Sequence, residues 1–468
     1  MRSTRQRLDR HSFVGRYPLS TLLLLTTLAT GGAVASCSSD EEPNRLDPGD
    51  ASLEAWTPTE EAGSFDDGGA DALSDAEPVL DAAPFDAGPR PVECTSAPCA
   101  TELVTTFAPI ESDRSEGFCA LLNDGTVACW GANGYGQLGR GPDAGTLDSP
   151  TAMHVTGLSD IAHLNHTCAI DKSGGAWCWG RGPFLQNDAG LVTSESAPVK
   201  LALPAAKRVA VGLNVGCAVV DDGVLCWGRN SNAQLAPLSE ANISAVFLPR
   251  PMSFPSGAPV RDVFVGNGSF AVREDGRMST WGARTSLARA TPLTPDPYPT
   301  DIQLAGISSI DVTLDNGCAT VAGVGYCWGR AIVTSAVNSV IRVLPEAVAT
   351  PEPIVQISTT RAFVTTELGD TIQRPQRWCA VGVSGDVYCW GYNASGQAGD
   401  GTKTDAFDRA VKVKGLPEPA NQVRTMPDAT CALLTNGKVY CWGSNNNGQL
   451  GNGVLRAPSL VPQEVVLP

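Results

Sequence analysis

The cysteines of this chain are the residues best placed to do chemistry, because twelve of the fifteen stand in regular pairs. In each pair the two cysteines are nine or ten residues apart, and Trp-Gly follows the second one directly. The pairs are Cys119 and Cys129, Cys168 and Cys178, Cys217 and Cys226, Cys318 and Cys327, Cys379 and Cys389, and Cys431 and Cys441. Thiols in such pairs can ligate a metal, form a redox couple, act as a nucleophile or join in a disulfide.

The residues between the cysteines predict a β-hairpin, because β-forming residues flank an Asp-Gly, Asn-Gly or Ser-Gly turn. If residues 123–125 form the loop, Leu122 pairs with Thr126 and Cys119 faces Cys129. Facing Cα atoms of an antiparallel pair are about 4.5 or 5.5 Å apart, a separation that a disulfide can span. The repeats that begin at Cys217 and Cys318 are one residue shorter between the cysteines, so they require a tighter turn.

The fourth repeat favours disulfides over the other thiol chemistries. It has Phe270 and Thr280 where the other repeats have cysteine, so both partners are absent together. Cys94 and Cys99 form a natural seventh pair, which leaves Cys37 over. A Cys-x-x-Cys redox motif is lacking, and only four histidines are available to complete zinc sites. The sequence therefore predicts seven disulfides and an oxidising compartment.

The first 36 residues have the pattern of a secretory signal peptide. Five arginines precede an apolar stretch, residues 19–36, that ends in small residues. Residues 34–37, Val-Ala-Ser-Cys, resemble the lipobox of bacterial lipoproteins, in which the cysteine becomes the acylated first residue. The resemblance implies a lipid anchor at Cys37 and a place in the bacterial cell envelope, and Ser38 after it favours the outer membrane. The alternative is ordinary cleavage, with Cys37 incidental.

Residues 37–100 are predicted to be an acidic, disordered tether. Residues 38–93 carry 16 Asp or Glu against two Arg and few bulky apolar side chains, so they cannot bury a core. The acidic run could instead hold a cation or a partner, but a solvated spacer is the simpler interpretation. Of the net charge of −16, residues 94–468 carry −6, which argues against a nucleic-acid partner.

The hairpin phrase occurs seven times between residues 101 and 468. Its tryptophans are Trp130, Trp179, Trp227, Trp281, Trp328, Trp390 and Trp442, which are 47 to 62 residues apart. A period near fifty with several short strands in each unit indicates a β-propeller. A Trp beside a Gly in every repeat is better explained by packing between blades than by a binding pocket.

With this pattern the chain resembles the regulator-of-chromosome-condensation (RCC1-like) repeat family. The clearest matches are Asp124-Gly125, Trp130-Gly131, Asn133 and residues 136–139 (Gly-Gln-Leu-Gly) in the first repeat, and Trp442-Gly443, Asn445 and residues 448–451 in the last. The resemblance covers residues 102–468 and weakens in repeats two to five. It implies an all-β fold, a seven-bladed β-propeller of four-stranded blades.

The C-terminus is predicted to close this ring. Residues 462–468 resemble the Pro-led strand at residues 198–204, which the first repeat lacks. We therefore expect the C-terminal strand to complete the first blade, so that no sheet edge remains free.

Few residues suggest catalysis or a cofactor. His154, His163 and His166 all lie in one part of the chain, and His163 and His166 with Asp160 make a weak metal set without a second ligand group. Nucleophile-elbow, phosphate-loop, helical zinc and sialidase motifs are absent from the sequence. We therefore expect no catalytic residue, metal or cofactor.

The expected function is a membrane-anchored scaffold that binds a protein or a glycan. The founding family member is an exchange factor for a small nuclear GTPase, which an exported lipoprotein would not meet, whereas a secreted bacterial relative binds β-lactamases across one propeller face. The candidate contacts follow Trp-Gly, at Tyr135, Phe184 and Tyr392, and in the longer segments 283–300 and 331–378. The alternative is a carboxylate-based glycan hydrolase or lyase on the same fold.

Overall fold

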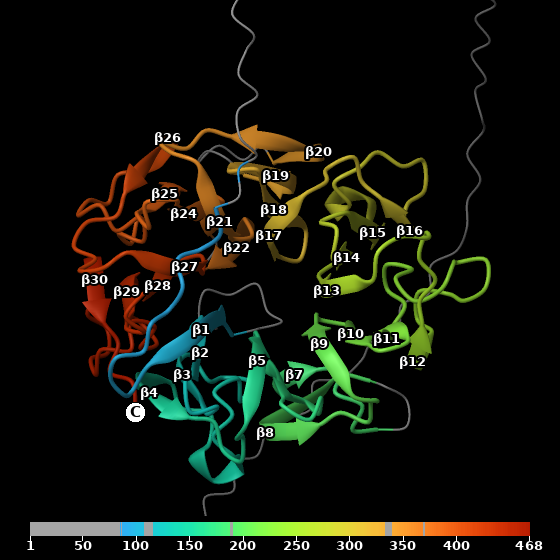
Figure 1. The fold of residues 1–468 in the computed structure, drawn as a ribbon, viewed down its shortest axis with the longest axis horizontal. Helices are drawn as coiled ribbons and strands as arrows, with labels where there is room; N and C mark the ends of the chain where they lie inside the picture. The colour runs from blue at the N-terminus through green and yellow to red at the C-terminus, as the bar shows by residue number, and fades with distance from the viewer. Residues whose placement is uncertain (1–84, 86, 107–115, 188–190, 333–338, 368–369) are drawn as a thin grey trace, which may run out of the picture. The chain divides into compact units, whose positions relative to one another are not determined.

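The computed structural model describes residues 85, 87–106, 116–187, 191–332, 339–367 and 370–468. These residues form seven four-stranded antiparallel sheets, arranged as the blades of a β-propeller (Figure 1). The first strand of each blade lies nearest the centre of the ring and the last strand lies at its rim. The predicted all-β fold with seven blades is confirmed.

In each blade the strands lie in chain order from the centre of the ring to its rim. Blades 1 to 3 are β1 (Ala100–Thr105), β2 (Gly117–Leu122), β3 (Val127–Gly131), β4 (Ser149–His154); β5 (Ile161–Asn165), β6 (Cys168–Asp171), β7 (Ala176–Gly182), β8 (Thr193–Lys200); and β9 (Ala206–Val211), β10 (Val215–Val220), β11 (Gly223–Arg229), β12 (Val246–Pro251). Blades 4 and 5 are β13 (Val260–Val265), β14 (Gly268–Arg273), β15 (Met278–Gly282), β16 (Asp296–Asp301); and β17 (Ile307–Val312), β18 (Asn316–Val321), β19 (Val324–Ala331), β20 (Val340–Val348). Blades 6 and 7 are β21 (Ile354–Thr359), β24 (Arg377–Gly382), β25 (Val387–Gly391), β26 (Ala406–Lys412); and β27 (Ala420–Thr425), β28 (Ala429–Leu434), β29 (Val439–Gly443), β30 (Ser459–Glu464). The remaining elements are the hairpin β22 (Phe363–Glu367) and β23 (Asp370–Arg374), and the short 3-10 helices η2 (Pro142–Ala144) and η3 (Arg284–Ser286).

The two central strands of the blades are the predicted hairpins, with the predicted register. The Leu122 N–H donates to the Thr126 carbonyl over 2.8 Å, and Cys119 faces Cys129. In the shorter repeat at Cys217 the loop shrinks to two residues, because Val220 already pairs with Gly223. The turn chemistry of the sequence thus fixes which residues face each other.

Seven disulfides join the expected pairs. The Cα atoms of each hairpin pair lie 4.1 Å apart, and Cys94 is joined to Cys99. In blade 4 the buried Phe270 faces Thr280 instead, and the Thr280 hydroxyl donates to the Leu287 carbonyl over 2.8 Å. Disulfides in this number are typical of a protein that folds in an oxidising compartment outside the cytoplasm.

Tryptophan side chains hold neighbouring blades together. The indole N–H groups of six buried tryptophans each donate to a backbone carbonyl in the segment that follows Trp-Gly in the preceding blade. These bonds are Trp130 to Gln449, Trp179 to Gln137, Trp227 to Pro183, Trp281 to Gln234, Trp328 to Ser286 and Trp442 to Gln397, at 2.6 to 3.0 Å. The repeated Trp is therefore a packing group between blades.

The C-terminal strand completes the last blade, so the predicted closure of the first blade was wrong. β30 pairs with β29, and blade 1 has its own inner strand, β1. The comparison with residues 198–204 misled because those residues overlap and follow β8, the outer strand of blade 2, and do not begin the next blade. A Pro-led strand thus follows the cysteine hairpin of its own blade.

The ring closes through the interface between blades 7 and 1. The Leu103 N–H donates to Gln422 Oε1 over 2.9 Å, and the Asp428 N–H donates to Glu116 Oε1 over 2.8 Å. The segment before β1 also runs along blade 7, where the Glu93 N–H donates to the Thr435 carbonyl over 2.7 Å. Closure therefore depends on side-chain packing and hydrogen bonds between the two terminal blades.

No helix in the described part of the chain is long and apolar enough to cross a membrane. The predicted signal peptide, Cys37 and most of the predicted tether lie outside the described residues.

Candidate functional site

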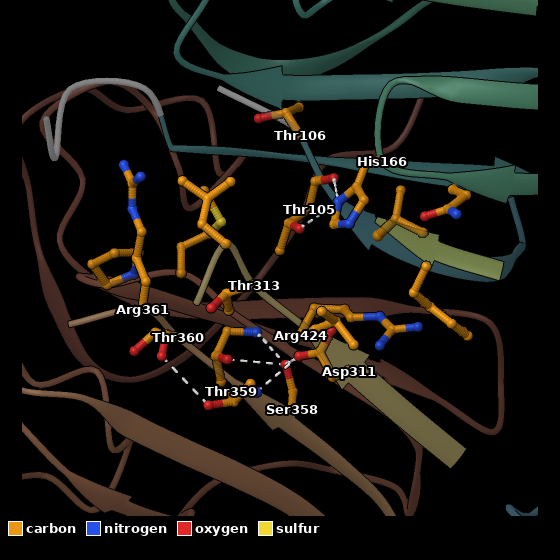
Figure 2. Close-up of a pocket in the computed structure, with 18 of the residues that line it drawn as sticks. Thr105, Thr106, His166, Asp311, Thr313, Ser358, Thr359, Thr360, Arg361 and Arg424 are labelled. Carbon is orange, nitrogen blue, oxygen red and sulfur yellow. Dashed lines mark hydrogen bonds between the residues drawn. The ribbon is translucent and has the colours of Figure 1, made fainter. Parts of the chain in front are cut away.

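A cavity of about 170 Å³ lies among the innermost strands of six blades (Figure 2). Its lining comes from the ends of β1, β5, β13, β17, β21 and β27 and from the connections that follow them. The Trp-Gly end of each hairpin reaches the same end of the ring, because Gly131 faces Gly117 at the start of β2. We call this end of the propeller the cavity face.

One wall of the cavity is a hydrogen-bonded group around Asp311 of β17. Oδ2 of Asp311 accepts hydrogen bonds from the Ser358 hydroxyl and the Thr359 N–H, both over 2.8 Å. The Ser358 hydroxyl in turn accepts a hydrogen bond from the Thr425 N–H over 3.1 Å. Three blades thereby fix the position of this carboxylate (Figure 2).

The opposite wall carries His166, which lies in the turn between β5 and β6 with a positive φ of 50°. Its Nδ1 lies 3.0 Å from the Thr105 hydroxyl and 3.1 Å from the Thr105 carbonyl. Burial lowers the pKa of His166, the Arg424 charge adds to this, and the Asp311 charge opposes it. The imidazole is therefore neutral at neutral pH.

Arginine side chains bring positive charge to the same cavity. Arg424 of β27 donates from Nε to the Leu103 carbonyl over 2.9 Å, which ties blade 7 to blade 1. Arg361 and Glu116 also line the cavity and add one charge of each sign. The cavity thus combines two acids, two arginines and a neutral histidine with several threonine hydroxyls.

A deeply buried arginine lies next to the residues that line the cavity. Arg377 donates to the Met426 carbonyl over 2.6 Å and the Gln397 carbonyl over 2.6 Å, so it joins blade 6 to blade 7. Burial lowers the pKa of Arg377 to about 9, and the Glu116 charge opposes this shift. The guanidinium remains charged at neutral pH and acts as a structural link.

Blade 6 has an additional hairpin at the cavity face. β22 and β23 pair with each other in the connection between β21 and β24, residues 360–376, whereas the same connection in blade 7 is residues 426–428. Among the described residues, this is the only connection between the first two strands of a blade that forms a sheet of its own. Figure 1 places β22 close to the inner strand β21.

The two long segments predicted to be insertions consist mainly of blade strands. Segment 331–378 includes β20 and β21, and its extra length is the β22–β23 hairpin. Segment 283–300 includes η3 and most of β16, the outer strand of blade 4. The spacing between tryptophans measures total length and cannot separate a blade strand from an added loop.

The three predicted contact residues differ in exposure. Phe184 is fully buried in the core between blades 2 and 3, which contradicts its interpretation as a surface contact. Tyr135 is half-buried, with the Arg181 guanidinium 5.9 Å from its ring centre, and Tyr392 is half-buried at the end of β25. Of the three residues, only the two tyrosines are partly exposed.

The three residues of the weak metal set lie in different surroundings. His163 contacts Glu102 at 3.4 Å, Asp160 contacts Lys172 at 3.8 Å, and His166 faces the cavity. The described residues contain no group of three or more metal-ligating side chains that could hold an ion.

Sequence reasoning missed the residues of the cavity. Asp311, Ser358 and Arg424 lie near the ends of inner strands, before the cysteine hairpins that carry the repeat signal. Each stands in a different repeat with a different side chain, so no periodic pattern marks them. The only available signal was polar residues ending short apolar strands.

Comparison with known proteins agrees with this architecture. The model of the regulator of chromosome condensation (RCC1) repeat matches residues 115–137 and 428–449. The ultraviolet-B receptor UVR8 of Arabidopsis thaliana is 28% identical over 351 residues, which cover 71% of this chain and 76% of UVR8. The human E3 ubiquitin-protein ligase HERC2 is 27% identical over 177 residues, which cover 35% of this chain and only 4% of HERC2.

Solved structures show the same fold. In the crystal structure of yeast RCC1 (Prp20) with Kap60, the similarity has a TM-score of 0.59 at 18% identity and covers 73% of this chain and 84% of the other. The matched repeats lie in blades 1 and 7, the two blades that close the ring. In its repeats and its seven blades, this chain is similar to proteins built from RCC1 repeats.

Proposed function

We propose that this protein is a lipid-anchored scaffold outside the cytoplasm, which binds a partner protein at the cavity face. The observation that carries the proposal is the β22–β23 hairpin, because a backbone element outside the blades adds surface beside the inner strands. Extra loops on a rigid scaffold usually serve binding. A protein partner has precedent in the fold, since yeast RCC1 was crystallised with Kap60 bound.

The anchoring part of the proposal rests on the sequence and on the disulfides. The lipobox-like residues 34–37 supply the acylated cysteine, and the seven disulfides fit an exported protein of a bacterial cell envelope. The acidic tether would then separate the propeller from the outer membrane.

Photo-crosslinking on intact cells tests the binding face. A photoreactive amino acid at Tyr135 or Tyr392 should capture one protein partner, while the same group at Tyr440, near the opposite end of blade 7, should capture none. Replacing residues 363–374 with Gly-Gly should abolish capture, whereas changing the turn at Ser384 and Gly385 should leave it intact. Capture that survives loss of the hairpin contradicts the proposed face.

Two further measurements separate the alternatives. Saturable binding of a cell-wall or capsular glycan without turnover would show that the partner is a glycan and not a protein. Turnover of the glycan would favour the hydrolase or lyase. Cys37→Ser should move the protein from the membrane fraction to the soluble fraction and abolish lipid labelling. Unchanged labelling of that variant would exclude Cys37 as the anchor.

A further inference from the structure

The cavity is suited to a ligand of its own, independent of any partner protein. We propose that it binds a small zwitterion of the free α-amino acid class, with the ammonium group on Asp311 and the carboxylate on Arg424. The side chains of the cavity walls would hold this ligand whether or not a protein binds the cavity face.

Asp311 offers half of its carboxylate to the cavity. Both of its hydrogen bonds, from Ser358 and Thr359, go to Oδ2. Oδ1 has no hydrogen-bond partner among the described residues. An ammonium group at Oδ1 would form a charge-assisted hydrogen bond without disturbing the existing ones.

Arg424 offers the complementary half of a binding site. Its Nε is engaged by the Leu103 carbonyl, while its two terminal nitrogens have no hydrogen-bond partner in the part of the chain that the structure describes. A guanidinium is well shaped to hold a carboxylate through two parallel N–H donors. Neither Arg424 nor Asp311 has an ion-pair partner among the described residues within 4.0 Å, so the two charges do not neutralise each other directly.

The mixed charges of the cavity walls disfavour a ligand that is purely an anion or purely a cation. Asp311 and Glu116 repel an anion, and Arg424 and Arg361 repel a cation. A zwitterion places each charge beside the opposite one, which makes up for the loss of its hydration. Thr106 is 3% exposed, and its buried hydroxyl group lacks a hydrogen-bond partner among the described residues, so a polar ligand atom would satisfy it.

The size and the apolar walls narrow the ligand further. A cavity of about 150 Å³ in another protein holds benzene, so a cavity of about 170 Å³ admits a molecule of amino-acid size and excludes a long peptide. Phe264, Ile310 and Leu314 contribute apolar surface to the lining. We therefore expect a small apolar side chain, such as that of leucine or methionine.

Thermal shift of the full-length protein with each of the twenty free L-amino acids, followed by calorimetry, tests the proposal. L-Leucine or L-methionine should bind one to one and raise the melting temperature. Two analogues of L-leucine each lack one charged group: 4-methylpentanoate lacks the ammonium group and 3-methylbutylamine lacks the carboxylate. Each analogue should bind with an affinity about tenfold lower than that of L-leucine, or lower still. Absence of binding by every amino acid overturns the proposal, as does equal binding of either analogue.

Variants identify the two anchoring residues. Asp311→Asn and Arg424→Gln should each weaken amino-acid binding about tenfold or more. The matched changes Asp275→Asn and Arg277→Gln, on the exposed turn between β14 and β15 at the opposite end of blade 4, should bind like the unaltered protein. If Asp311→Asn or Arg424→Gln binds the amino acid with normal affinity, the assignment of that residue is wrong. If a variant does not fold, binding of the two leucine analogues to the unaltered protein tests the proposal.

Discussion

At the scale of single residues, the tryptophan after each cysteine hairpin links two blades. Trp179 is fully buried, and its indole N–H donates to the Gln137 carbonyl of blade 1 over 2.9 Å. The neighbouring glycine segments allow this contact: at Gly139, whose φ is +64°, an added Cβ would lie 3.1 Å from the Trp179 ring. One side chain thus combines apolar burial with a hydrogen bond across the interface.

Trp179→Phe should lower the free energy of unfolding by about 1–3 kcal/mol, because the Gln137 carbonyl loses its buried donor. Trp177→Phe is the matched control, since its indole N–H donates to the carboxylate of Asp171 at a more exposed site. Chemical denaturation followed by tryptophan fluorescence measures both. If both variants lose the same free energy of unfolding, the hydrogen bond between the blades contributes no stability of its own.

His166 should make the stability of the propeller depend on pH. Its pKa is lowered in the folded protein, whereas in the unfolded chain it is about 6.5, so the unfolded chain binds more protons below that pH. The contribution of His166 is therefore complete above about pH 6.5 and is lost as the pH falls toward the lower folded pKa.

His166→Asn provides the comparison, since asparagine tolerates the positive φ at this position and does not titrate. The free energy of unfolding of the original protein, measured between about pH 8 and pH 5, should fall more steeply than that of the variant. Parallel curves would contradict a buried neutral histidine.

At the scale of elements, the hairpins are local and the outer strands are not. A cysteine pair and its turn lie within about a dozen residues, so the register of β2 and β3 followed directly from the sequence. The assignment of β30 to blade 7 did not, because an outer strand pairs across a long loop. The same uncertainty concealed the β22–β23 hairpin within a segment that also contains blade strands.

Deleting residues 459–468 should destabilise blade 7 and, through it, the ring. β29 would lose its outer partner, and Val465, which is 4% exposed in the core shared by blades 1 and 7, would be removed. We expect a lower melting temperature and proteolysis that begins in blade 7. The control is Val466→Ser, at a side chain that is 57% exposed, and its melting temperature should be unchanged. An unchanged melting temperature of the truncated chain would refute the role of β30.

At the scale of the whole molecule, the ring is closed without a covalent bond between its terminal blades. Every disulfide in the described part of the chain joins residues five to ten positions apart, so each one stabilises a single hairpin or the short segment before β1. Closure instead depends on Trp130, Leu103, Asp428 and the segment along blade 7. The disulfides therefore stabilise the individual hairpins, whereas the interfaces between blades stabilise the closed ring.

Reduction should nevertheless unfold the protein. Each closed loop of this size contributes about 2–3 kcal/mol, and six such hairpins together exceed or match the 5–15 kcal/mol of a typical domain. Refolding with and without a reducing agent, followed by circular dichroism and a thiol assay, tests this expectation. A reduced chain that still unfolds cooperatively near the original melting temperature would show that blade packing alone suffices.

The sequence by itself determined the repeat, the hairpins, their cysteine pairing and the number of blades. These features depend on contacts between residues near one another in the chain, where spacing and turn chemistry leave one solution. Only the tertiary structure decided which blade receives the last strand, that Phe184 is buried, and that Asp311 and Arg424 face one cavity. Those outcomes depend on how seven blades meet around a centre, and residues more than a hundred positions apart become neighbours there only when the ring has closed.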